Sequence, residues 1–267
     1  MGRYQYLYDK KKVLGVIMDI QTKIDRTWDF CINKYGPERL ISLCHHGSYN
    51  YNLALPDSDA DAKLIIAPTW DDVVRNRQPL SETIEGPFGD INVTDVRLYI
   101  DVNLRKQNFN FIETLFTPYS CVNPDYADLW EQLLDYREAI AHYKPEKAVR
   151  TMMGQAENQY KRWGKFDDNK TLYHMLRIEH AISEYISGER FEDTLAPKGE
   201  DHDFIMLVRE GSFDKSTMEK IFNRSYQHCQ EMASARKAVK PQEFVADIVM
   251  DRILDKMMRR ALGFPAQ

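Results

Sequence analysis

The sequence lacks the marks of several protein classes. No apolar run approaches the roughly 20 residues of a membrane helix, and residues 1–12 contain no apolar stretch typical of a secretion signal. Internal repeats and low-complexity tracts are absent. The cysteines lie far apart without a Cys-x-x-Cys pair, which argues against a zinc site or a disulfide frame: Cys31, Cys44, Cys121 and Cys229. We therefore expect a cytoplasmic protein with reduced thiols and no membrane association.

An excess of positive charge is also missing. The net charge is −5, which argues against a protein that coats nucleic acid, although a local basic groove stays open. With 43% hydrophobic and 12% aromatic residues, the composition excludes a disordered chain. A length of 267 residues accommodates one elaborated domain or two small ones.

Hydrophobic periodicity divides the chain into two parts. Short apolar or alternating runs predict strands at 40–44, 59–66 and 90–94, with helices at 13–35, 70–77 and 96–104. Beyond about Pro118 apolar residues recur at helical steps and strand patterns vanish. We therefore predict an α+β fold, with a small mixed-sheet core over 1–118 and an all-helical half over 119–267.

The most informative motif is Gly47-Ser48 followed by Asp59-x-Asp61. In a strand, Asp59 and Asp61 would point to the same face, where two carboxylates favour a hard cation, Mg²⁺ or Mn²⁺. Gly47 allows close approach of a phosphate, and Ser48 offers a hydroxyl and an N–H group. A third carboxylate would complete a two-metal site; Asp90 begins the next strand, and Asp95, more simply a helix cap, is the alternative.

Basic residues of the helical half form a second candidate feature. Steps of four and three place Lys170, His174 and Arg177 on one helical face, which suits a triphosphate or another polyanion. His45 and His46 are adjacent at the end of the first predicted strand, so in an extended segment they face opposite sides. One is expected in the core, and contact of the other with the nucleotide stays an open alternative. Glu113 either orients a basic residue or belongs to a plain buried ion pair.

These residues resemble a known family. Gly47-Ser48 with Asp59-x-Asp61 is similar to the signature of the DNA polymerase β-like nucleotidyltransferase superfamily, in particular its branch from bacteria and their phages. Three further blocks match that branch in order, at 90–97, 108–116 and 170–189. The sequence departs from the pattern at Asn52, where the family has Gly in Tyr-Gly-Leu, and at Leu98 and Phe109.

The resemblance implies transfer of a nucleoside monophosphate from an NTP, such as ATP, to a hydroxyl acceptor, with release of pyrophosphate. Asp59, Asp61 and Asp90 would be the catalytic carboxylates and ligands of two Mg²⁺ ions. Gly47 and Ser48 would hold phosphates, with Lys170, His174 and Arg177 also binding the nucleotide.

Three alternatives stay open at this point. The acceptor could be a tRNA 3′ end or a protein hydroxyl instead of a small molecule. The chain could be a non-catalytic nucleotide-binding or antitoxin-like partner. It could also be a helical interaction protein with an incidental Gly-Ser motif. The sequence leaves the preferred base and the oligomeric state undetermined.

Overall fold

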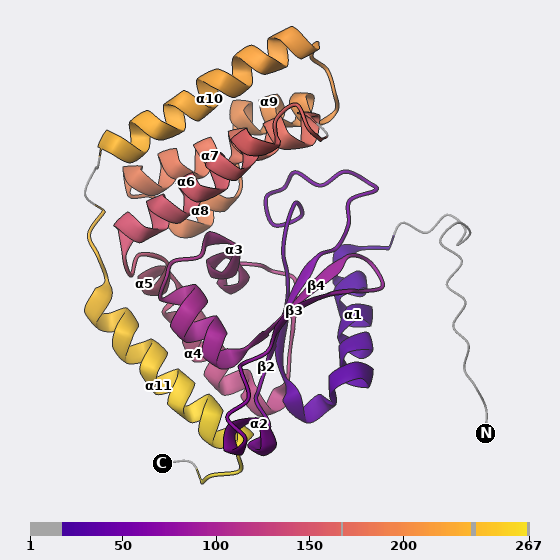
Figure 1. The fold of residues 1–267 in the computed structure, drawn as a ribbon, viewed down its shortest axis with the longest axis vertical. Helices are drawn as coiled ribbons and strands as arrows, with labels where there is room; N and C mark the ends of the chain where they lie inside the picture. Colours follow the sequence, from indigo (N-terminus) through magenta and orange to yellow (C-terminus); the bar gives the residue numbers. More distant parts are fainter. Residues whose placement is uncertain (1–17, 167, 236–238, 266–267) are drawn as a thin grey trace, which may run out of the picture.

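A mixed sheet lies at the centre of the N-terminal part, and helices follow it (Figure 1). The computed structural model describes residues 18–166, 168–235 and 239–265. Within these residues the strands come first and a long helical series follows, which confirms the predicted α+β class.

The sheet has the strand order β3-β4-β2-β1-β5. Its strands are β1 (Leu40–His45), β2 (Ala62–Ile66), β3 (Ser81–Glu85), β4 (Asp90–Asp95) and β5 (Ser120–Val122). β2 and β4 run parallel, whereas the other neighbours are antiparallel. Every residue of β1 and β2 is buried, so these central strands read as apolar runs with little alternation.

Two strands escape the sequence patterns, and a third begins later than predicted. β3 is an exposed edge strand of mostly polar residues, and β5 has only three residues. β5 belongs to the sheet, because it pairs with β1, although it lies beyond the expected boundary at residue 118. The division into two domains stays a prediction. The strand predicted from residue 59 begins at Ala62, because the Ala60 N–H bonds to the Phe88 carbonyl in the β3–β4 hairpin instead.

Helix α1 (Ile20–Tyr35) covers one face of the sheet (Figure 1). The helix predicted from residue 13 begins at Ile20, where the Asp19 carboxylate accepts a hydrogen bond from the Thr22 N–H at 3.0 Å. Residues 13–17 lie outside the described residues. Gly36, with φ +84°, ends the helix as predicted. The core on this face joins α1 to β1, β2 and β4.

The opposite face carries the second and larger core, which continues into the helical half. Its elements include η2 (Leu98–Leu104), α3 (Phe109–Ile112), η3 (Glu113–Leu115), α4 (Ala127–Asp135), α5 (Arg137–Ala141), α6 (Pro145–Arg162), α7 (Asp168–Ser187), α8 (Phe191–Leu195), α9 (Gly199–Arg209), α10 (Lys215–Ala235) and α11 (Glu243–Ala261). Helix α7 lies at the centre of this half and contacts α6, α8, α9 and α10. The short elements η1 (Pro37–Arg39), α2 (Trp70–Val74) and η4 (Pro124–Tyr126) complete the chain.

Across the described residues, no helix is long and apolar enough to cross a membrane. All four cysteines are free, as the sequence predicts.

Candidate active site

One cleft gathers most of the residues that the sequence singles out. It has a volume of about 630 Å³. It is lined by the segment 46–61 between β1 and β2, together with residues of α6, α7 and α9. The predicted site residues that line it are Gly47, Ser48, Asp59, Asp61, Lys170, His174 and Arg177. Asp90 is the predicted site residue that does not line the cleft.

The Gly47-Ser48 loop follows β1 directly and opens toward the cleft. Gly47 has φ +122°, a conformation that favours glycine, and no atom lies within 4 Å of the position a Cβ would take. Within the described residues, the Ser48 hydroxyl and N–H have no hydrogen-bond partner, whereas the Ser48 carbonyl accepts from Leu53. The loop therefore presents free donors and open space to a ligand.

Glu113 anchors this loop from below. Its side chain is fully buried and accepts hydrogen bonds from the Gly47 N–H at 3.2 Å, the Asn50 amide at 2.8 Å and the Tyr51 hydroxyl. His46 Nδ1 also lies 3.1 Å from Glu113 Oε1. Burial alone would raise the pKa of this carboxyl, but the neighbouring His46 and Tyr51, with the Arg177 charge, lower the pKa to about 2. Glu113 is therefore a carboxylate inside a polar network, which is more than the plain ion pair considered above.

The two aspartates of the motif lie on the segment that leads into β2. Asp59 is exposed, Ala60 is buried and Asp61 is half-buried, so the alternation expected of an extended segment holds even before the strand begins. Asp61 Oδ1 accepts a hydrogen bond from the Asp90 N–H at 2.9 Å. Gly89 makes this contact possible, because a Cβ there would lie only 2.7 Å from Asp61 Oδ1.

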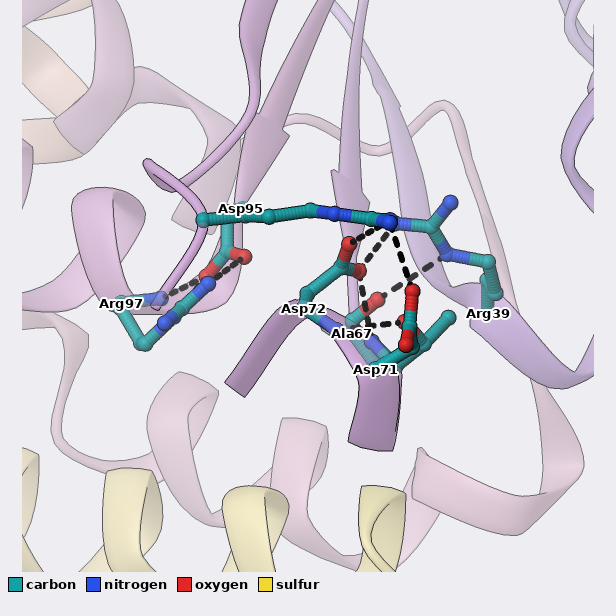
Figure 2. Close-up of polar contacts among 8 residues, drawn as sticks. Arg39, Ala67, Asp71, Asp72, Asp95 and Arg97 are labelled. Carbon is teal, nitrogen blue, oxygen red and sulfur yellow. Dashed lines mark hydrogen bonds and ion pairs between the residues drawn. The ribbon is translucent and has the colours of Figure 1, made fainter. Parts of the chain in front are cut away.

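The third carboxylate can be placed by strand register. β2 and β4 run parallel with Ala62 opposite Ile91, so Asp90 begins its strand beside Asp61. Asp95 pairs with Ile66 at the other end, five residues or about 17 Å from Asp90 along the strand. There its carboxylate is bound by the Arg97 guanidinium at 2.7 and 2.9 Å (Figure 2). Of the two candidates, only Asp90 lies at the cleft end of the sheet.

The cleft carboxylates suit a hard cation in part. No three His, Cys, Asp or Glu side chains gather as a metal site in the described portion of the chain. Asp59 and Asp61 both line the cleft, however, and Mg²⁺ is commonly bound by one or two carboxylates together with substrate phosphates. These two residues therefore fit a cation that arrives with a nucleotide, while a metal-binding role for Asp90 stays a prediction.

Helix α7 brings its cationic face to the opposite wall, as its sequence spacing predicts. Arg177 is only 5% exposed, and its guanidinium stacks on the Tyr51 ring at 4.1 Å. Its Nε and Nη1 atoms have no hydrogen-bond partner in the described residues. Burial, together with the positive charges of Arg177 and Lys170, lowers the pKa of His174 well below its usual value. The imidazole is therefore neutral, and the arginine keeps unused donors.

The adjacent histidines divide between core and cleft, with one in the core as predicted, while contact of the other with a nucleotide stays a prediction. His45 is fully buried, and its ring makes edge contacts with Tyr49 and Tyr119, with centroids 5.4 and 6.1 Å apart. Burial lowers the pKa of His45 to about 4, so this side chain is a neutral part of the core. His46 instead lines the cleft.

Sequence reasoning missed a cleft cation on α9. The Arg209 guanidinium donates to the Leu53 carbonyl and, at 2.9 Å, to the Ser58 hydroxyl, which ties α9 to the loop before Asp59. No local pattern marks this residue, because its partners lie about 150 positions away.

The polar stripe on α6 was also missed, although its steps of three, one and three could have revealed it. The α6 residues of this stripe are Gln155, Asn158, Gln159 and Arg162. Two amide side chains from neighbouring elements, Asn110 and Asn169, line the cleft with them.

Comparison with known families identifies the chain. Residues 20–190 match the family described as the RNA repair pathway DNA polymerase beta family. The chain belongs to this family. It is thus a polymerase β-like nucleotidyltransferase by descent, and family membership supports an enzyme that performs nucleotidyl transfer.

Other comparisons add little. A nucleotidyltransferase-like protein from Exiguobacterium sibiricum 255-15, solved at 1.90 Å, is similar over 90% of this chain and 80% of its own. The identity is 7% and the TM-score is 0.30, so the family match alone identifies the chain. No curated protein matches it.

The structure explains one departure from the pattern of the polymerase β-like superfamily. Asn52, at the position of the glycine in Tyr-Gly-Leu, has φ +55°. Asparagine tolerates this left-handed conformation better than other non-glycine residues do. The loop therefore keeps the backbone shape that glycine would favour.

Proposed function

We propose that this protein transfers a nucleoside monophosphate from an NTP to a hydroxyl acceptor and releases pyrophosphate. The observation that carries the proposal is the pairing of two cleft walls. Asp59 and Asp61 lie on one wall without an ion-pair partner in the described residues, and Arg177 lies on the other with two buried donors unused. A triphosphate bound with Mg²⁺ or Mn²⁺ would satisfy both walls.

Each residue has a defined part in this proposal. Arg177 and Lys170 bind the negative triphosphate, and the Ser48 hydroxyl and N–H donate to its oxygens. Asp59 and Asp61 hold the cation, which when bound neutralises the phosphates and the leaving group. The acceptor oxygen attacks the α-phosphorus, the bond to the β-phosphate breaks, and pyrophosphate leaves. Asp90, beside Asp61, takes the proton of the acceptor hydroxyl.

For the acceptor, the family description favours an RNA end over a small molecule or a protein hydroxyl. The charge around the cleft agrees with this choice. Arg162 lines the cleft at the end of α6, and Lys161 and Lys165, close to it in the sequence, are exposed. Exposed cations next to a cleft residue suit a polyanion that is longer than one nucleotide.

Calorimetry of each NTP with Mg²⁺ tests the nucleotide site, with the wild type set against the double variant Asp59→Asn, Asp61→Asn. We expect metal-dependent binding by the wild type and its loss in the variant. Binding of no NTP by the wild type would contradict the proposal. Pyrophosphate release with a single-stranded RNA oligonucleotide then tests the acceptor. If the protein binds NTP but releases no pyrophosphate in the presence of RNA, a small hydroxyl compound or a protein, the non-catalytic, antitoxin-like alternative would be favoured.

A further inference from the structure

Glu113 occupies a position that the transfer reaction itself does not use. It lies in η3, between α3 and β5, and its carboxylate is completely buried. It does not line the cleft, yet its three hydrogen bonds all reach the segment 47–51 that forms one cleft wall. A buried charge is costly unless hydrogen bonds satisfy it, so this carboxylate depends on the conformation of that segment and stabilises it in turn.

The contact with Gly47 determines how the loop faces the cleft. Because the Gly47 N–H points to Glu113 at 3.2 Å, the following peptide presents the Ser48 N–H and hydroxyl without internal partners. Asn50 reinforces this arrangement, since its amide donates both to Glu113 at 2.8 Å and to the His45 carbonyl at 3.0 Å. The loop is thus held at both ends of its turn.

A second contact connects Glu113 to the opposite wall. The Tyr51 hydroxyl donates to Glu113, and the face of the same ring lies 4.1 Å from the Arg177 guanidinium. The ring therefore has its tilt fixed by Glu113 and supports the side chain whose Nε and Nη1 are unpartnered. One buried carboxylate thereby orients donors from two elements that are far apart in the sequence.

We propose that Glu113 is a positioning residue that aligns the Ser48 loop and, through Tyr51, Arg177 for binding of the triphosphate. This inference rests on the proposed NTP site and adds to it a group that never touches the substrate. In Glu113→Gln, the side chain loses its charge and keeps one accepting oxygen, so either the Tyr51 hydroxyl must accept from the new NH2 group or Gly47 and Asn50 lose their acceptor. Either rearrangement weakens the hold of this side chain on the loop and on the Tyr51 ring.

The first experiment measures the affinity for NTP and for inorganic tripolyphosphate with Mg²⁺ in Glu113→Gln. We expect both affinities to fall about tenfold or more. Asp95→Asn is the matched control, because it removes another buried carboxylate at the far end of the sheet, away from the cleft. Its affinities should equal those of the wild type. If Glu113→Gln binds like the wild type, the inference is overturned while the NTP site stands.

A double-mutant cycle separates positioning from general stability. If Glu113 acts through the loop, Ser48→Ala and Glu113→Gln each weaken binding, but together they weaken it by clearly less than the product of the two factors. Fully multiplicative losses would overturn the inference, since a purely structural role has no reason to depend on Ser48.

Tyr51→Phe keeps the experiment decisive if Glu113→Gln does not fold. The variant retains the ring beneath Arg177 and removes only the hydroxyl that bonds to Glu113. We expect tripolyphosphate affinity to fall about threefold or more. An unchanged affinity would count against the inference, whereas failure of the wild type itself to bind would count against the proposed function.

Discussion

The two ends of the central sheet carry aspartates and arginines in quite different states. At the α2 end the charges are paired. Arg39 contacts Asp72, and Arg97 binds Asp95 (Figure 2). Arg77 contacts both Asp71 and Asp72.

At the cleft end, Asp59 and Asp61 have no ion-pair partner among the described residues, and Arg177 has two unpartnered buried donors. Charges of opposite sign thus line one cleft, and no ion pair joins Asp59 or Asp61 to Arg177. The comparison teaches that paired charges complete a fold, whereas charges kept apart in a cleft leave room for a ligand that bridges them.

The largest expected difference between the two ends is in catalysis. Asp61→Asn should reduce pyrophosphate release by roughly 10³-fold or more, because it removes a cation ligand. Its thermal midpoint should change little, since the amide oxygen can still accept the Asp90 N–H. Asp72→Asn is the control at the other end, where the carboxylate caps α2. That variant should lose about 1 kcal/mol of stability and keep its activity. Activity in Asp61→Asn would remove the reason for treating the ends differently.

A second prediction concerns the pH dependence of stability and the buried His45, which is next in sequence to the cleft residue His46. The folded pKa of His45, about 4, lies below the usual 6.5, so the unfolded chain takes up a proton first. The contribution of neutral His45 is complete above pH 6.5 and is lost as the pH falls through 4, with a total of at most about 3 kcal/mol.

His45→Leu should therefore flatten the curve of unfolding free energy against pH between 6.5 and 4. Urea unfolding at several pH values measures this. Parallel curves for the variant and the wild type would show that His45 is not the group responsible.

A third prediction compares two arginines, one from each end of the sheet, by their effects on stability and on binding. Arg97→Gln leaves the buried Asp95 carboxylate without its charged partner and should lower the free energy of unfolding by about 2 kcal/mol. Arg177 has two donors, Nε and Nη1, without a hydrogen-bond partner in the described residues, so Arg177→Gln should cost less stability than Arg97→Gln and should weaken NTP binding about tenfold or more. Chemical unfolding and calorimetry on both variants test this difference. Equal effects of the two substitutions on stability and on binding would contradict the contrast between the two ends of the sheet.

The smallest expected effect is at Asn52. Asn52→Ala should lower stability by about 1 kcal/mol, because alanine tolerates φ +55° poorly. Asn52→Gly should stay within a few tenths of a kcal/mol of the wild type. The Asn52 side chain is exposed, and the contact of the Asn52 backbone carbonyl with His202 is retained in both variants. A change in packing therefore does not affect the result. Equal stability of the two variants would mean that the backbone shape of this loop is not what the residue provides.

Local patterns predicted much of this protein. The apolar run at 40–44 became β1 because a strand buried on both faces needs apolar residues throughout. The steps between Lys170, His174 and Arg177 placed all three on the cleft because helix geometry alone sets which residues share a face. The Gly47-Ser48 and Asp59-x-Asp61 motif likewise lines one cleft, as a short connection between neighbouring strands allows.

What the tertiary structure decided depends on contacts between distant segments. β3 and β5 are short or polar, and only their pairing with β4 and β1 makes them strands. Register, which no sequence pattern states, placed Asp90 and not Asp95 beside Asp61.

Glu113 and Arg209 became part of the site through partners about 65 and 150 residues away. By itself the sequence determined the apolar central strands and the amphipathic helices with the faces they present, because these depend on neighbours along the chain. The meeting of those faces depended on packing, which local spacing does not encode.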